Sequence, residues 1–297
     1  MSAVAADAPW LRFARDYASS RVALAGFVLL ALILGAALAA PWLAPQNPYD
    51  LMQIDILDSR LPPGSASADG SITYHLGTDE QGRDMLSAIL YGLRISVSVG
   101  VAATVLALAI GMTLGLIAGF RGGAFDALLM RLADLQLAFP SILVAMILLA
   151  LFGQGMEKII LALVASQWAY YARTTRAAAL VERDKDYIAA ARLLGLSTPR
   201  IVLRHLLPNC LPPLIVVASL QVAAAIALEA TLSFLGLGLP VTEPSLGLLI
   251  ANGFQHLYAG RYWISVFPGV ALLLTILAIN LVADQVRDVL NPRLRSA

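Results

Sequence analysis

The sequence is poor in charge, in lysine and in cysteine. Only 13% of its 297 residues are charged, against roughly 25% in soluble domains, so we do not expect a water-soluble fold. Lysine occurs only at Lys158 and Lys185 and the formal net charge is +1, which leaves no basic surface for nucleic acid. The single cysteine, Cys210, excludes an internal disulfide.

Residues that could support catalysis or bind a metal are also scarce. The three histidines, His75, His205 and His256, lie far apart in sequence, so we predict no local metal site. The dipeptide Gly-Lys never occurs, which excludes ATP binding through a P-loop. A membrane enzyme would need a nucleophile and a base at one membrane depth, yet Ser141 and Ser166 have no histidine inside a predicted span. We therefore expect a non-catalytic chain that binds no cofactor itself.

Apolar residues are correspondingly abundant, at 59% of the chain with a mean hydropathy of +0.79. A membrane-spanning helix needs roughly 20 largely apolar residues, and stretches of about this length recur along the sequence. We predict an all-α integral membrane protein with six transmembrane helices, at residues 22–43, 95–120, 135–153, 159–176, 212–235 and 262–283.

Two of these spans have an alternative interpretation. The fourth is free of charge only over residues 159–172, so a re-entrant or interfacial helix is its alternative. The first follows three arginines and contains Ala37-Leu38-Ala39, which also fits a signal peptide with a small-residue cleavage site. The orientation of the later spans is the same in either case.

The arginines predict the orientation of the chain, because cytoplasmic flanks of short loops retain basic residues. With both termini in the cytoplasm, fifteen of the 20 basic residues lie inside. The five outside are Arg60, Arg83, Arg94, Lys158 and Arg261. The same topology makes residues 44–92 an acidic external loop, large enough to fold over a pore mouth, although its first half could equally be a solvated connector.

Small residues recur at every fourth position of the second span, at Ala103, Ala107, Gly111, Gly115 and Gly119. On a helix these positions form one stripe, along which a neighbouring helix can approach closely and gain packing in lipid. We therefore assign Gly111, Gly115 and Gly119 to helix packing.

The longest cytoplasmic connection, residues 173–213, has the local signals of two short helices around a glycine. We predict that Asp186 caps a helix over 187–194 and that Gly195 ends it in the left-handed conformation. Thr198 can cap the second helix, which we expect to stop at Pro208. Helices this short need a partner surface for stability.

This connection resembles the EAA motif of bacterial binding-protein-dependent ABC importer permeases. That motif reads Glu-Ala-Ala, three residues, Gly, nine residues, an apolar residue, any residue and Leu-Pro. Five positions match at the full spacing, while Ala189 replaces the usual Glu and His205 the usual Ile. Loss of the Glu should weaken the start of the helix modestly. The matching positions are Ala190, Ala191, Gly195, Leu207 and Pro208.

Further blocks are similar to the C-type permease of dipeptide and oligopeptide importers. They are Leu76-Gly77-Thr78-Asp79, Gly82-Arg83-Asp84, the run from Glu229 to Gly238, Phe267-Pro268-Gly269, and segments between Asn280 and Leu294. The resemblance implies the type I importer permease fold, with one peripheral helix before a core of five. It divides the chain into a tail with the first helix (1–60), an external loop (61–93), the permease domain with coupling helices at about 186–208 (94–284) and a cytoplasmic tail (285–297).

The resemblance also implies partners in the bacterial inner membrane: a second homologous permease, two ATPases that hold ATP and Mg²⁺, and a periplasmic substrate-binding protein. The residues expected to couple to the ATPases are Asp186, Tyr187, Ala190, Ala191, Gly195, Arg204, His205, Leu207 and Pro208. Those expected at the external gate or the binding-protein contact are Gly77, Thr78, Asp79, Gly82, Arg83 and Asp84.

Dipeptides or oligopeptides are the solutes that the resemblance implies, and nickel complexes, glutathione or another peptide-like compound are its alternatives. An ion-coupled secondary carrier would depend on intramembrane charge. Glu229 is the one acid well inside a predicted span. It could line the pore or a gate, or it could lie near the outer interface with Arg94 as its partner.

Overall fold

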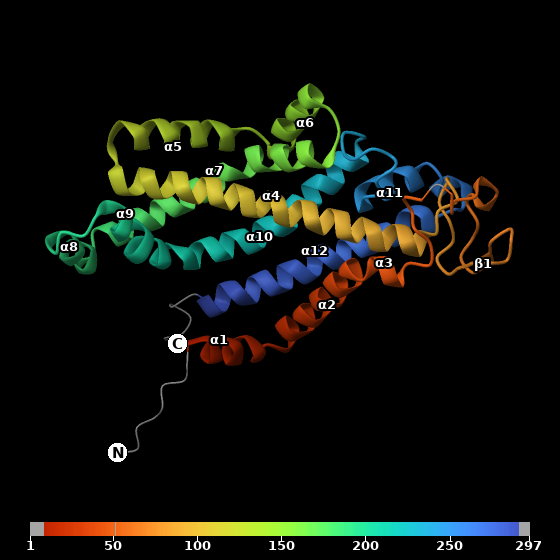
Figure 1. Ribbon diagram of the computed structural model, residues 1–297, viewed down its shortest axis with the longest axis horizontal. Helices are drawn as coiled ribbons and strands as arrows, with labels where there is room; N and C mark the ends of the chain where they lie inside the picture. Colours follow the sequence, from red (N-terminus) through yellow and green to blue (C-terminus); the bar gives the residue numbers. More distant parts are fainter. Residues whose placement is uncertain (1–8, 51, 291–297) are drawn as a thin grey trace, which may run out of the picture.

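The computed structural model describes residues 9–50 and 52–290, and its long helices lie side by side along one axis (Figure 1). The short helices α8 and α9 lie at one end of this bundle, and the strands β1 and β2 lie at the other. The helices are α1 (Pro9–Ala18), α2 (Arg21–Leu38), α3 (Ala40–Leu43), α4 (Met85–Arg121), α5 (Gly123–Ala138), α6 (Ser141–Phe152), α7 (Met156–Arg183), α8 (Asp186–Leu193), α9 (Thr198–Ile201), α10 (Leu207–Phe234), α11 (Leu246–Phe254) and α12 (Trp263–Leu290). The shorter elements are η1 (Ile56–Asp58), β1 (Ser65–Ala66), β2 (Thr73–Tyr74), the π-helical η2 (Val202–Leu206) and η3 (Leu257–Ala259), and β1 pairs antiparallel with β2.

Four helices of the described chain are long and apolar enough to cross a membrane: Arg21–Leu38, Met85–Arg121, Thr198–Phe234 and Trp263–Leu290. The bent pair of α5 and α6 adds a fifth crossing if it counts as one span. The expected span at 159–176 lies within α7, which carries Arg173 and Arg176 and is not among these candidates. The helical membrane fold is therefore confirmed, and the count of six spans remains a prediction.

A single helix over 135–153, as the sequence predicts for the third span, is wrong. The chain breaks after Ala138, and the axes of α5 and α6 differ in direction by 93°. The cause is Pro140, because a residue before proline is driven out of the α region. Phe139 is accordingly extended, with φ −91° and ψ 139°.

The prediction that Pro208 stops the second cytoplasmic helix is also wrong. The helix runs without a break from Thr198 through the π-helical η2 into α10. Proline in a regular α-helix clashes with the carbonyl four residues earlier, but in η2 the hydrogen bonds span one residue more, so that the Leu207 N–H donates to the Val202 carbonyl. The Asn209 side-chain amide also donates to the His205 carbonyl oxygen at 2.7 Å.

Helices α4 and α7 pack in close contact along the stripe of small residues. A methyl group added to Gly111 would lie 2.4 Å from the Trp168 carbonyl oxygen, and one added to Gly115 would lie 2.5 Å from the Ala172 carbonyl oxygen. Contacts between real Cβ atoms and oxygen are never this short, so only glycine allows the two backbones to approach so far. The structure thus places the expected packing stripe against α7.

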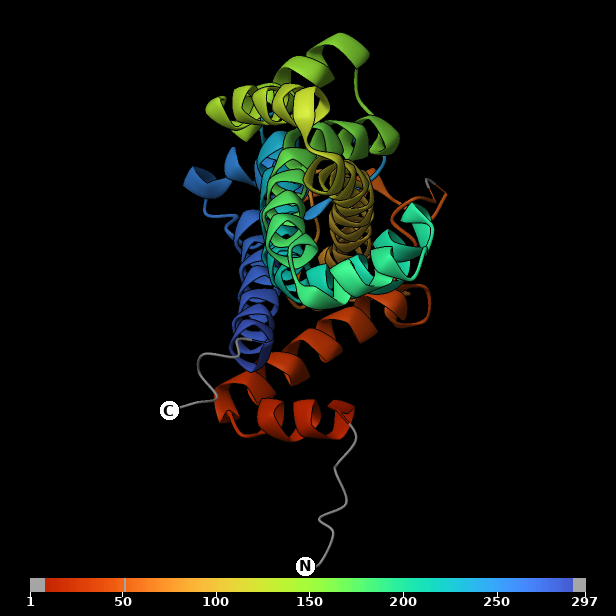
Figure 2. The ribbon, with the colours of Figure 1, turned by 90° about the vertical axis from the view of Figure 1, so that its left-hand side faces the viewer.

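The first helices lie outside this core. Seen along the bundle, α1 and α2 lie at one side, next to α12 (Figure 2). Gly26 of α2 allows the contact, since a methyl group there would lie 2.6 Å from Leu281 Cβ of α12. This arrangement agrees with one peripheral helix beside a compact core.

We expect Gly115→Ala to lower the free energy of unfolding by about 1–3 kcal/mol, because the added methyl group would overpack the contact between α4 and α7. The matched control is Gly269→Ala in α12, where nothing lies within 4 Å of the added methyl group. Denaturant titration of both variants in mild detergent measures the difference. Equal stability of the two variants would contradict close packing at Gly115.

Candidate functional site

A complete helix-ending turn fixes the tip of α8. Gly195 has φ +70°, its N–H donates to the Arg192 carbonyl at 3.0 Å, and the Leu196 N–H donates to the Ala191 carbonyl at 3.2 Å. These are the two hydrogen bonds of a Schellman motif, which requires a left-handed residue at the position of Gly195. The structure therefore gives Gly195 the conformation that the sequence predicts.

The start of α8 differs from the prediction. Asp186 does not cap the helix but is its first residue, and Lys185 precedes it without a capping side chain. Glu182 at the end of α7 holds this joint instead, since it accepts hydrogen bonds from Lys185 Nζ and Tyr187 Oη, both at 2.6 Å. Thr198 likewise is the first residue of α9 rather than its cap, which is Ser197.

The joint between α7 and α8 is fixed at neutral pH. Burial alone would raise the pKa of Glu182, but the hydrogen bonds from Lys185 and Tyr187 outweigh it and lower the pKa. Burial, and then the neighbouring Glu182, raise the pKa of Tyr187 to about 12. Glu182 is therefore ionised and Tyr187 protonated at neutral pH, so the acceptor and the donor both persist.

The inner face of α8 and α9 packs on the ends of two long helices. Ile188 and Ala191 of α8 and Ile201 of α9 are buried, and they form one cluster with Leu116 of α4 and Ala179 of α7. Leu206 and Cys210 complete this cluster and are fully buried. We call the unit of α8, α9 and this cluster the foot.

The outer face of the foot exposes large apolar side chains. Leu193 is 90% exposed, Leu194 is 78% exposed and Leu203 is 62% exposed. The sequence analysis missed all three leucines, although two consecutive leucines before a helix-ending glycine are a usable signal. Of the residues predicted to couple, Asp186, Tyr187, Ala190, Gly195, Arg204 and Pro208 are exposed, His205 and Leu207 are half-buried, and Ala191 is buried.

At the opposite end, the turn at residues 77–84 is an internal scaffold. Arg83 is 1% exposed, and it bonds through Nε to Asp79 Oδ2 at 2.6 Å and through Nη1 to the Val241 carbonyl at 3.2 Å. The Trp263 indole N–H donates to the Thr78 carbonyl at 3.1 Å, and Asp84 caps α4 by accepting from the Ser87 N–H at 2.8 Å. These contacts tie the turn to α4, to α12 and to the loop before α11.

The two glycines of this turn are required by their surroundings. Gly77 and Gly82 have φ values of +78° and +84°. A methyl group on Gly82 would lie 2.1 Å from the Asp55 carbonyl oxygen. Because the expected gate residues are buried, their role in binding-protein contact stays a prediction, and such a contact would use the surface that they support.

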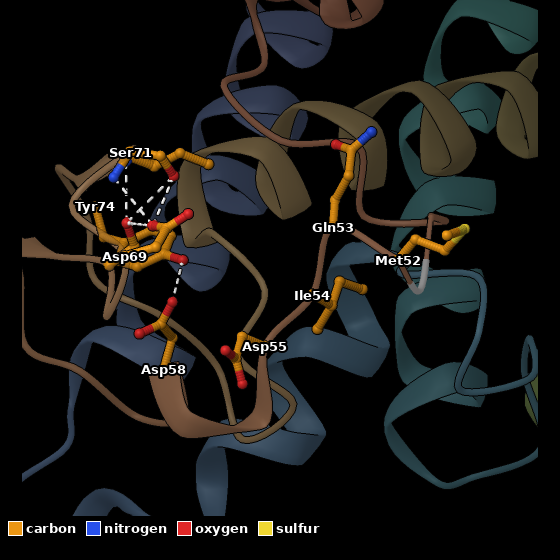
Figure 3. Close-up of a pocket in the computed structure, with 10 residues that line it drawn as sticks. Met52, Gln53, Ile54, Asp55, Asp58, Asp69, Ser71 and Tyr74 are labelled. Carbon is orange, nitrogen blue, oxygen red and sulfur yellow. Dashed lines mark hydrogen bonds between the residues drawn. The ribbon is translucent and has the colours of Figure 1, made fainter.

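Asp58 organises the outer part of this loop, beside a pocket of about 410 Å³ (Figure 3). Its carboxylate accepts from Tyr74 Oη at 2.8 Å and from the Ala68 N–H at 2.9 Å. Asp69 accepts from Ser67 Oγ, from the Ser71 N–H and from Ser71 Oγ, which together lower its pKa to about 2. Asp58 and Asp69 are thus committed to holding the loop together.

Glu229 is enclosed between helices. It is 0% exposed, and it accepts from Ser96 Oγ of α4 at 2.9 Å and from Ser233 Oγ one turn along α10 at 2.7 Å. The prediction that Arg94 pairs with Glu229 is wrong, because Arg94 is exposed and the hydroxyl groups of Ser96 and Ser233 donate to the carboxylate instead. In this conformation Glu229 joins α10 to α4, and a pore-lining role stays a prediction.

Known proteins share this architecture. Two structures of the MetNI methionine ABC transporter in inward-facing conformations match with TM-scores of 0.54 and 0.55, at 21% and 22% identity. Each match covers 69% of this chain and 97% of the other. The fold is that of a type I ABC importer permease.

Sequence comparisons agree. Residues 111–296 match the family described as "Binding-protein-dependent transport system inner membrane component", and residues 8–63 match "N-terminal TM domain of oligopeptide transport permease C". The "Di/tripeptide transport system permease protein DppC" of Pseudomonas aeruginosa is 39% identical over 97% of this chain and 94% of its own length. The "Dipeptide transport system permease protein DppC" of Escherichia coli is 40% identical over the same shares.

The chain belongs to the family of binding-protein-dependent transport system inner membrane components, as the EAA-like motif indicates. It is a multi-pass membrane protein and a permease subunit of an ABC importer. Partner ATPases and a binding protein follow from this membership in general.

We expect Gly195→Val to reduce solute uptake strongly without changing the amount of chain in the membrane. The added Cβ would meet no neighbour, because nothing lies within 4 Å of it, but a left-handed β-branched residue costs about 1–3 kcal/mol. Gly195→Asn is the matched control, since asparagine tolerates this conformation. Uptake assays at equal expression test the pair, and normal uptake by the valine variant would contradict a role for the α8 tip.

Proposed function

We propose that this chain forms a pathway for dipeptides or oligopeptides into the bacterial cell, together with a second homologous permease, two ATPases and a periplasmic binding protein. The printed names of the relatives support the peptide substrate, because those proteins align over nearly the whole of both chains. Both termini and the foot lie on the cytoplasmic side, as the distribution of arginine indicates.

The exposed leucines of the foot are the observation that carries the proposed contact with the ATPases. Leu193 and Leu194 project from the bundle at 90% and 78% exposure, in a segment outside every candidate membrane span. Large apolar side chains exposed to water mark a surface for a protein partner. The partner that this family requires on the cytoplasmic side is an ATPase, so we assign these leucines to its binding groove.

The attachment of the foot makes it suitable as a lever. Ile188 and Ile201 pack on Leu116 and Ala179, so a push on α8 moves the ends of α4 and α7 as well. Interdigitated side chains transmit such a displacement because packed interiors have low compressibility. Closure of the ATPases would thereby tilt the helices between inward-open and outward-open states. ATP and Mg²⁺ belong to the partner ATPases, and the chain itself holds no cofactor.

Reconstitution tests the proposed function. Proteoliposomes that contain both permeases and both ATPases, with the binding protein outside, should accumulate a radiolabelled dipeptide only when ATP is enclosed. A proton ionophore should have no effect on this uptake, because only an ion-coupled carrier depends on the proton gradient that the ionophore dissipates. Competition by glutathione or a nickel complex, but not by peptides, would assign the alternative solute, and uptake without ATP would refute the proposal.

Replacement of the leucines tests the docking surface. We expect Leu193→Ser with Leu194→Ser to weaken binding of the ATPases by at least about tenfold, since burial of one leucine contributes about 1.5–3 kcal/mol. Leu193→Met with Leu194→Met is the control, because it keeps apolar side chains of similar volume. The amount of ATPase that co-purifies with the permease measures the effect. Full recovery of ATPase with the serine variant would exclude the leucines from the interface.

A further inference from the structure

Two arginines of α7 face carboxylates of α5, and the two ion pairs differ in how tightly they are closed. Arg176 donates to Asp126 through both Nε and Nη2, and these side chains are 31% and 13% exposed. Arg173 Nη1 lies 3.6 Å from Asp134 Oδ1, and these side chains are 64% and 51% exposed. The first pair holds α5 against α7, whereas the second is loose and leaves both charges accessible.

The loose pair lies inside the bundle rather than at its end. The carbonyl oxygen of Ala172, directly before Arg173, lies against Gly115 of α4, which is a candidate membrane span. Gly115 precedes Arg121 at the end of α4 by six residues, which is about 9 Å at 1.5 Å per residue. Asp134 belongs to the bent pair of α5 and α6, which together qualify as a broken span. Both charges therefore lie at the depth of a membrane-spanning helix.

Lipid is an unfavourable environment for this loose pair. Ionised side chains exposed to hydrocarbon are costly, so charged groups at membrane depth face the bundle interior or a water-filled cavity. A pair with a structural role alone would be closed and shielded, as the pair of Arg176 and Asp126 is. The exposure of Arg173 and Asp134 therefore favours contact with water and a polar ligand.

A cavity of about 490 Å³ adjoins Arg173, between α7 and α10. Its polar lining comes from Arg173 and Thr174, and the rest of the lining is apolar. The apolar wall consists of Ala177, Ala178 and Val181 of α7 and Pro213 of α10. Ligand sites have volumes of about 300–1,000 Å³ and combine an apolar lining with a few polar groups. The cavity thus has room for a small solute with a charged group beside Arg173.

The charges at this cavity are complementary to a small peptide with free termini. Such a peptide carries one carboxylate and one ammonium group, as the loose pair carries one cation and one anion. The Arg173 guanidinium can bind the carboxylate through two parallel hydrogen bonds, and the Asp134 carboxylate can accept from the ammonium group. Each charge then keeps a partner, so the ligand leaves no unpaired charge inside the membrane. Because both side chains are more than half exposed, the peptide can also leave, as passage through a pathway requires.

We propose that Arg173 and Asp134 form a transient site for the two termini of a peptide in the translocation pathway, beside the apolar wall of the cavity. This inference rests on the proposed function, because it assigns residues to the passage of the same solute. The site would favour peptides with both termini free over solutes that lack either charge. This chain would then add a selective step to the choice made by the binding protein.

Neutral substitutions test the site in the assembled importer. We expect Arg173→Gln and Asp134→Asn each to lower ATP-driven uptake of a dipeptide into proteoliposomes at least about tenfold, because each removes a charge-assisted contact. ATP hydrolysis stimulated by the peptide-loaded binding protein should stay at the wild-type level. A loose ion pair adds little to stability, so both variants should assemble in wild-type amounts. The control is Arg131→Gln, at an exposed position of α5, which should not change uptake.

Photocrosslinking gives a readout that a purely structural role would not produce. A benzophenone amino acid in place of Ala177, which is exposed and lines the cavity, should attach a tritiated dipeptide during ATP turnover. The same amino acid in place of Val105, exposed on α4 outside the cavity, should not. Addition of Arg173→Gln should lower the label at position 177 at least about tenfold.

Other outcomes would overturn the inference. Wild-type uptake by both neutral variants, or attachment of the probe at position 177 to the second permease or to lipid alone, would show that the cavity does not receive the peptide. Failure of both variants to assemble would assign the pair a structural role and refute the site. ATP-dependent uptake by the wild-type importer in the same preparation separates these results from failure of the proposed function. If that uptake occurs while the variants match it, the importer function stands and the site alone is refuted.

Discussion

The close approach of α4 and α7 is the constraint on which the rest of the structure depends. In lipid there is no hydrophobic drive between helices, so their association relies on tight packing. Gly111 and Gly115 bring the two backbones together, and a side chain at either position would meet the carbonyl oxygens of α7 directly. The pair then serves as a fixed base at one end of the bundle, where Leu116 and Ala179 contact the inner face of α8 and α9. The close glycine contact between α4 and α7 therefore also fixes the two helix ends on which the foot packs.

Polar groups at the two ends have a different task from those inside the bundle. Arg83, Asp79 and Asp58 are buried outside the candidate spans, where hydrogen bonds from backbone and side chains hold an otherwise irregular loop in place. Glu229 lies within α10, and two serine hydroxyls satisfy it without a cation. Hydroxyl partners suit a carboxylate between packed helices, since they add no second charge that must be desolvated. The buried polar residues therefore position elements, and the exposed apolar residues are the ones available to partners.

The sequence was sufficient for features that depend on local chemistry. Gly195 and its left-handed turn, the glycine stripe of α4 and the helical membrane class all follow from short patterns with a direct physical cause. Predictions failed where one signal competed with another. Pro140 breaks the third predicted span although the residues around it are apolar. Pro208 does not end its helix, because the π-helical η2 changes the hydrogen-bond register just before it. The hydrogen-bond partner of Glu229 could not be predicted from the sequence. Ser96 is 133 positions from Glu229, and no pattern in either segment indicates that the two residues meet.

The length of α4 connects the two ends of the bundle. It has 37 residues, which corresponds to a rod of about 55 Å at 1.5 Å per residue. Its first turn is capped by Asp84, directly after the turn at residues 77–84, and near its other end Leu116 packs on the foot that presents Leu193 and Leu194. An event at either end therefore acts on the same helix, and α7 is bound to that helix along its length. The glycine stripe fixes α7 to this helix, and packed interiors have low compressibility, so a displacement at one end of α4 is carried to α7 as well.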